Sequence, residues 1–96
     1  MVKKWTFITN HGAVITAIAK NRKVKAVDIA LELGITERSV RRIIADLVAG
    51  NYITKKREGG INLYEVNHDL PLRRKSMQYI KLRDLMKACS LEDNSE

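Results

Sequence analysis

The sequence has few of the residues on which several protein classes depend. Cys89 is the only cysteine among 96 residues, which excludes an internal disulfide and a multi-cysteine metal cage. One proline and five glycines are too few for a collagen-like or low-complexity chain. No apolar run approaches the ~20 residues that a membrane-spanning helix needs, and residues 1–6 lack the apolar stretch of a secretory signal. We therefore expect one soluble cytoplasmic domain.

Recognisable sets of catalytic or metal-binding residues are also missing. His11 and His68 lie far apart in the sequence, and neither has a ligand neighbour at zinc spacing. The glycines at 59 and 60 lack the Lys-Ser/Thr and the helix that a phosphate-binding loop requires. No nucleophile has an evident base or oxyanion partner. We expect no enzyme activity, no cofactor and no metal, and we interpret Cys89 as a small buried hydrophobe.

Positive charge is the first feature that points to a partner. Eighteen Lys and Arg residues stand against eleven Asp and Glu, for a net charge of +7. Three of those acids, Glu92, Asp93 and Glu96, lie in the last five residues, so the remainder of the chain is more basic still. Such an excess attracts polyanions, of which nucleic acid is the commonest. The alternative is a charge that serves only solubility.

Apolar residues recur at helical spacing in three stretches, which predict helices over about 11–20, 26–33 and 37–49. Thr9 or Asn10 is expected to cap the first helix, and Asn21 to end it in a left-handed conformation. Gly34 is expected to end the second helix in the same way, and Thr36 to cap the third. The third has the regular spacing of a core-facing helix, with apolar residues Val40, Ile43, Ile44, Leu47 and Val48.

The spacing of the apolar residues is no longer helical after residue 50. Two β-prone stretches flank the turn signal Glu58-Gly59-Gly60 and predict a hairpin over 52–66 with a basic tip. A last apolar stripe predicts a helix over about 74–90. The fold class expected from this order is α+β and mostly α.

The Gly34-Ile35-Thr36 turn between two helices resembles that of a helix-turn-helix, in which glycine allows a steep crossing. Followed directly by a hairpin, the unit resembles the winged helix-turn-helix domain of bacterial and archaeal transcription regulators, with most of the likeness in residues 28–47. Residues 5–11 and 69–73 are similar to those of small MarR-like or ArsR-like regulators. The likeness covers about residues 5–73. It implies a DNA-binding domain over 1–73, a dimerisation helix over 74–91 and an acidic tail over 92–96.

Helical geometry predicts which side chains of the third helix lie on its outer face. At about 100° per residue, Arg38, Arg42 and Ala45 lie opposite the apolar side, with Ser39 and Arg41 on the flanks. Arg is suited to bidentate bonds with guanine, so we expect Arg38 and Arg42 to contact bases, Ser39 and Arg41 to contact bases or phosphates, and Thr36 to contact phosphate. The alternative is an ordinary solvated helix face.

The hairpin tip carries a second basic group, Lys55, Lys56 and Arg57. The resemblance places such a wing along the DNA backbone or in a minor groove, where negative potential favours cations. Charged residues also protect a strand edge from aggregation, and this alternative stays open.

The last helix is the candidate dimer interface, because the resembled regulators are usually homodimers and paired half-sites need two domains. Its stripe consists of Tyr79, Leu82, Leu85, Met86 and Cys89. Packing of this helix on its own domain is the alternative. The ArsR-like metal sensors typically carry paired cysteines or His/Asp clusters, which this chain lacks, and no small-molecule effector can be assigned.

We interpret the chain as a sequence-specific, double-stranded DNA-binding transcription regulator, with repression by occlusion as its simplest mode. The alternative from another class is a winged-helix module that binds an acidic protein. RNA binding is disfavoured, because the sequence offers no exposed aromatic cluster on which bases could stack.

Overall fold

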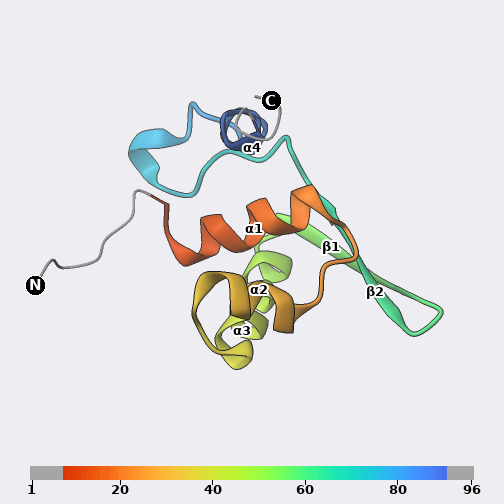
Figure 1. Cartoon of the computed structure of the whole chain (residues 1–96). Helices are drawn as coiled ribbons and strands as arrows, with labels where there is room; N and C mark the ends of the chain where they lie inside the picture. Colours follow the sequence, from red (N-terminus) through yellow and green to blue (C-terminus); the bar gives the residue numbers. More distant parts are fainter. Residues whose placement is uncertain (1–7, 91–96) are drawn as a thin grey trace, which may run out of the picture.

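The computed structural model describes residues 8–90 and has an α+β, mostly helical architecture. Three helices come first, and a two-stranded antiparallel hairpin follows them and extends away from the helices (Figure 1). The described elements are, in order, α1 (Asn10–Lys20), α2 (Ala26–Leu33), α3 (Glu37–Ala49), β1 (Ile53–Glu58), β2 (Ile61–Val66), the 3₁₀ helix η1 (Lys75–Met77) and α4 (Leu82–Ser90). The expected fold class is confirmed at this level. Residues 5–7 of the resemblance and the predicted acidic tail lie outside the described residues.

The helix ends follow the predicted signals with one exception. Thr9 caps α1, because its hydroxyl accepts a hydrogen bond from the Gly12 amide at 3.2 Å. Asn21 was expected to be left-handed, and this was wrong, since its φ is −148°. Its amide instead donates to the carbonyls of Ala17 and Ile18 at 3.1 and 3.2 Å. These bonds satisfy the helix end without a positive φ, and a turn at residues 22–23, closed by the Val24 amide donating to the Asn21 carbonyl at 3.0 Å, leads to α2.

The turn between α2 and α3 depends on one left-handed glycine. Gly34 has φ 72° and ψ 32°, and its amide donates to the Ala30 carbonyl at 2.9 Å. An L side chain rarely adopts this conformation, whereas glycine adopts it at little steric cost. Half-buried Ile35 then packs against the core, and Thr36 caps α3. The turn therefore fixes where α3 starts and how it leaves α2.

One apolar core joins the helices, the hairpin and α4. It is formed by inward side chains at helical spacing and by the aromatic rings at the base of the hairpin. Apart from the two tyrosines of this core, no polar or charged side chain is buried within residues 8–89. Burial of apolar surface is therefore the main stabilising term of the described fold. The fully buried side chains with the largest volumes are Ile18, Ile29, Ile53, Val14 and Val40.

The hairpin pairs Ile53 with Val66 at its base and Glu58 with Ile61 at its tip. Gly59 and Gly60 form the two-residue turn, with φ values of 57° and 80°. Positive φ at both central positions is what a type I′ turn requires, and its twist matches that of the flanking strands. The hairpin expected over 52–66 is confirmed, with its first strand beginning at Ile53.

The helix predicted over 74–90 is wrong in its first half. Residues Lys75–Met77 form only η1, and α4 begins at Leu82. The chain instead turns back on itself, because the Leu72 amide donates to the Ile80 carbonyl and the Leu82 amide to the Leu70 carbonyl, at 2.9 and 2.8 Å. These bonds between distant residues replace the i→i−4 bonds of a continuous helix. No helix within the described part of the chain is long and apolar enough to cross a membrane.

Helix α4 closes the core of its own chain. Leu82 and Met86 are only 3% and 5% exposed, and both belong to the single core. Leu85 and Cys89 are half-buried, whereas Tyr79 precedes the helix and is 82% exposed. Of the five residues expected at a dimer interface, two are therefore covered within one chain, and Tyr79 is not part of the helical stripe.

Replacement of Leu82 by Ala should lower the free energy of unfolding by about 2–5 kcal/mol, because it leaves a cavity in the core. The exposed Lys87→Ala on the same helix should change it by less than about 0.5 kcal/mol. Urea unfolding followed by circular dichroism measures both. A Leu82→Ala variant that unfolds like wild type would contradict the placement of α4 in the core of its own chain.

Candidate nucleic-acid interface

Helix α3 has one buried and one exposed side. Val40, Ile43, Ile44 and Leu47 face the core. On the other side, Arg38, Arg42 and Ala45 are exposed, at the i, i+4 and i+7 spacing that aligns side chains on one helix face. The small Ala45 side chain leaves this face open to close approach. The structure therefore brings Arg38 and Arg42 together as the sequence predicts.

The three arginines of α3 differ in their electrostatic environment. Arg41 donates from Nε to the Glu37 carboxylate at 3.1 Å, and its Nη2 donates to the same oxygen. This exposed i,i+4 pair largely offsets the positive charge of Arg41 locally. No hydrogen bond or ion pair within residues 8–90 involves the side chain of Arg38 or Arg42. The available positive charge of the outer face is thus concentrated in these two residues.

Thr36 and Ser39 form a cap at the start of α3. The Thr36 Oγ1 accepts a hydrogen bond from the Ser39 amide at 3.0 Å and donates to the Ser39 Oγ at 3.0 Å. The hydroxyl hydrogen of Thr36 is therefore used within the helix. Ser39 accepts in this pair, so its own hydroxyl hydrogen is left to donate outward. Of the two residues, Ser39 is better placed to contact a phosphate or base oxygen.

The cations of the hairpin are divided between its two faces. Lys55 pairs across the hairpin with Tyr64, Lys56 with Leu63, and Arg57 with Asn62. Since alternate residues of a strand point to opposite faces, Lys55 and Arg57 lie on one face and Lys56 on the other. All three are exposed, and Arg57 Nη1 also donates to the Asn62 Oδ1 at 3.3 Å. One flat ligand surface cannot contact all three cations at once.

The start of α3 and the hairpin tip line the same hollow of the surface, which has a volume of about 320 Å³. Arg41 and Glu37 of α3 line it together with residues 60–62 of the hairpin. The connection between α1 and α2 contributes Lys23 and Lys25. These two lysines were not among the predicted site residues. The basic run at residues 20–25 was the available signal, but sequence alone does not place it beside the start of α3.

The remaining ionisable clusters lie elsewhere and are small. His11 Nε2 is 2.9 Å from Asp46 Oδ2, and this exposed contact links the start of α1 to α3. Arg83 and Asp69 form a second exposed pair at 2.9 Å. Within residues 8–90, no three His, Cys, Asp or Glu side chains are arranged to hold a metal ion. The outer face of α3 is therefore the strongest candidate for recognition of another molecule.

No protein-family model matches this chain, and no curated protein matches it either.

The Thr36 cap gives a prediction that does not depend on function. Thr36→Ala should lower the free energy of unfolding by about 1 kcal/mol, because the Ser39 amide loses its acceptor. Thr36→Ser keeps the hydroxyl and should stay close to wild type. Denaturant unfolding monitored by circular dichroism compares the two. An equal loss in both variants would mean that the Thr36 methyl group, and not the cap, stabilises this end of α3.

Proposed function

We propose that this chain is a winged helix-turn-helix protein that binds double-stranded DNA and regulates transcription, in the manner of the small MarR-like or ArsR-like regulators that its sequence resembles. In this proposal α3 enters the major groove, and the hairpin is the wing, which contacts the backbone or a minor groove. The observation that carries the proposal is the pair of exposed arginines on the outer face of α3, Arg38 and Arg42, whose side chains have no ion pair in the described part of the chain.

The shape of α3 supports this role. The helix lies directly after the Gly34 turn, and its inner side is fixed in the core by four buried residues. The major groove is wide enough to admit such a rigid helix. Its two long arginines can reach the bases, and the small Ala45 that follows them allows close approach. Arginine can donate two hydrogen bonds to the O6 and N7 atoms of guanine, which discriminates between base pairs.

The surrounding charge supports docking on phosphates. The chain carries a net charge of +7, and Lys23 and Lys25 line the hollow beside α3 and the hairpin tip. Contacts with phosphates position a protein on DNA without reading its sequence. We assign this positioning to Lys23 and Lys25, to the hairpin cations and to Ser39, and base reading to Arg38 and Arg42.

Homodimerisation is part of the proposal, because two domains are needed to read a two-fold symmetric site. Leu82 and Met86 are already covered by their own chain. A partner chain would therefore meet Tyr79 and the half-buried Leu85 and Cys89. Occupation of a promoter by such a dimer would repress transcription by occlusion.

Selection of bound duplexes from a random DNA pool, followed by sequencing, tests the proposal directly. We expect enrichment of a palindromic motif whose half-sites lie about one helical turn apart. Competition with structured RNA should leave the DNA complex largely intact. Recovery of no motif, together with no steep salt dependence of binding, would contradict DNA recognition and favour a module that binds an acidic protein.

Arg42→Ala should weaken binding to the selected site by about 1–3 kcal/mol and relax the preference at one base pair, because a bidentate guanine contact is lost. Lys87→Ala removes a positive charge from the exposed surface of α4 and serves as the matched control. Gel-shift titrations on the selected site and on single-base variants measure both effects. Unchanged affinity of the Arg38→Ala, Arg42→Ala double variant would overturn the assignment of base readers.

Lys56→Ala should act differently from Arg42→Ala. Loss of a phosphate contact should weaken binding to all duplexes by similar factors and reduce the slope of log affinity against log salt by about 1. Gel shifts at several salt concentrations, with selected and scrambled duplexes, measure this slope. A loss of affinity for the selected duplex alone would indicate that Lys56 contacts a base or recognises the shape of a groove instead.

A further inference from the structure

Among the described residues, one acidic side chain, Glu37, lines the hollow between the start of α3 and the hairpin tip. Three cations line the same hollow, which are Lys23, Lys25 and Arg41. The side chains of Glu37 and Arg41 are 42% and 65% exposed, so a ligand can reach both. A carboxylate at this place reduces the attraction of the hollow for phosphate, although the rest of its charge favours phosphate.

The position of Glu37 follows from how α3 begins. Thr36 caps the helix through the Ser39 amide, and Glu37 is the first helical residue. Buried Val40 fixes this end of the helix against the core. Residues 37 and 41 are therefore held one turn apart on the same flank of α3, where their side chains meet. The Arg41 Nε donates to Glu37 Oε2 at 3.1 Å, and its Nη2 donates to the same oxygen. This edge of the guanidinium, which could donate two bonds to a phosphate, is thus occupied.

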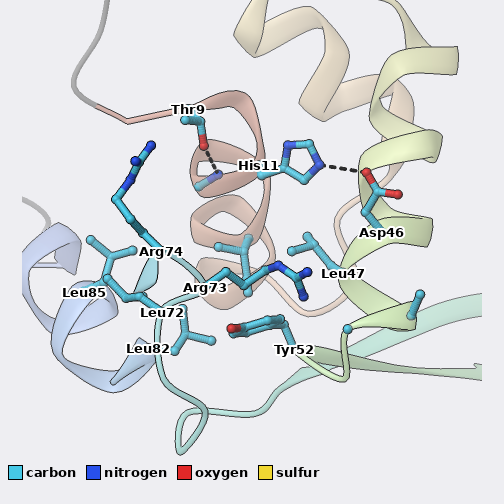
Figure 2. Close-up of a pocket in the computed structure, with 14 residues that line it drawn as sticks. Thr9, His11, Asp46, Leu47, Tyr52, Leu72, Arg73, Arg74, Leu82 and Leu85 are labelled. Atoms are coloured by element: carbon cyan, nitrogen blue, oxygen red, sulfur yellow. Dashed lines mark hydrogen bonds and ion pairs between the residues drawn. The ribbon is translucent and has the colours of Figure 1, made fainter. Parts of the chain in front are cut away.

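Helix α3 contains a second acid, Asp46, which has a different environment. Asp46 lies near the other end of the helix, beside a separate cavity of about 760 Å³ that α1 and α4 also line. Figure 2 shows it directed toward His11, whose Nε2 is 2.9 Å from Asp46 Oδ2. One acid of α3 thus binds a histidine of α1, and only Glu37 binds an arginine of the same helix.

The Glu37 contact makes a phosphate contact of Arg41 less favourable. An exposed ion pair of this kind is weak, so a phosphate can displace Glu37 from Arg41. The displaced carboxylate then stays in the hollow near the phosphate, and the two negative charges repel each other. Lys23 and Lys25 have no acidic partner within residues 8–90. Glu37 therefore acts mainly on Arg41 and leaves the two lysines available.

This effect is greatest for DNA of arbitrary sequence. Such complexes are held by phosphate contacts, and a protein can slide along the duplex until its free cations meet phosphates. At a selected site, base contacts of Arg38 and Arg42 fix the register of α3 and contribute free energy that Glu37 does not affect. Removing one available cation therefore weakens binding to arbitrary DNA more than binding to the selected site.

We infer that Glu37 is a specificity-determining residue of the proposed DNA interface, because it withholds Arg41 from phosphates and so keeps binding to arbitrary DNA weak. The inference rests on the proposed function. A repulsive group placed against unwanted partners is a general source of specificity. In this arrangement Arg38 and Arg42 read the sequence, whereas Glu37 limits the affinity that the duplex backbone alone can provide.

Glu37→Gln tests the inference, because it removes the carboxylate charge and keeps the size of the side chain. Fluorescence anisotropy over a salt series measures binding of the full chain to the duplex recovered by selection and to a random-sequence duplex of equal length. The random-sequence duplex should bind more tightly, with a slope of log affinity against log salt that is steeper by about 0.9. Its gain should be about three- to fourfold larger at about 50 mM than at about 200 mM salt. The selected duplex should gain less.

Two further variants separate the effect of Glu37 from net charge and from folding. Glu32→Gln removes the same charge from α2, where Glu32 is exposed and does not line the hollow, and it should keep the wild-type slope. Arg41→Gln alone should change the slope little, since Glu37 already withholds this cation. In the Arg41→Gln background, Glu37→Gln should no longer steepen the slope. Circular dichroism checks that each variant is folded, because Glu37 also stabilises the start of α3 through its charge.

The outcomes distinguish this inference from the proposed function. An unchanged slope in Glu37→Gln, the same steepening in Glu32→Gln, or an equal gain on both duplexes would overturn the role of Glu37 while DNA recognition stands. A slope that falls by about 1 in Arg41→Gln alone would do the same, because Arg41 would then already contact a phosphate. Wild-type protein that binds neither duplex would overturn both proposals.

Discussion

Burial of one side of α3 is the constraint on which the rest of the structure depends. Four apolar residues of this helix enter a core that, apart from two tyrosines, contains no polar or charged side chain within residues 8–89. Because a helix is rigid and turns by about 100° per residue, fixing the inner side also fixes the outer one. Arg38 and Arg42 therefore point to solvent as a consequence of core packing. Any partner of the outer face meets an already ordered helix backbone, so the entropy lost on binding is mainly that of the long exposed side chains.

Much of this arrangement could be predicted because its causes are local. Helices α1 to α3 follow from apolar spacing, the Gly34 turn from the need for a positive φ, and the hairpin from paired glycines at its tip. The exposed placement of Arg38 and Arg42 follows from the same periodicity. Each of these features depends on residues within about four positions of one another, and for such features propensity and periodicity point in the same direction.

The features that the sequence did not predict have distant causes. The expected helix over 74–90 begins only at Leu82, because backbone groups at 70 and 72 bond to residues 82 and 80. The extended Asn21 is the exception, since the two carbonyls of α1 that accept from its amide are only three and four residues away. Within the candidate site, the neutralising contact of Arg41 with Glu37 fits i,i+4 spacing. The position of Lys23 and Lys25 depends instead on how β2 bonds to the connection after α1, where the Tyr64 amide donates to the Arg22 carbonyl at 3.1 Å. Spacing alone carries no information about such long-range contacts.

The same fold separates its cations into groups with different environments. Arg41 is paired, Arg38 and Arg42 are open on a convex helix face, and Arg73 and Arg74 lie above an apolar cavity. Exposed cations on a convex face suit a large anionic groove, whereas a cation that is already paired, such as Arg41, has less charge left for a partner. A net charge of +7 would by itself suggest one polyanionic partner. The surroundings of each arginine, and not the total charge, therefore determine which anion it is suited to bind.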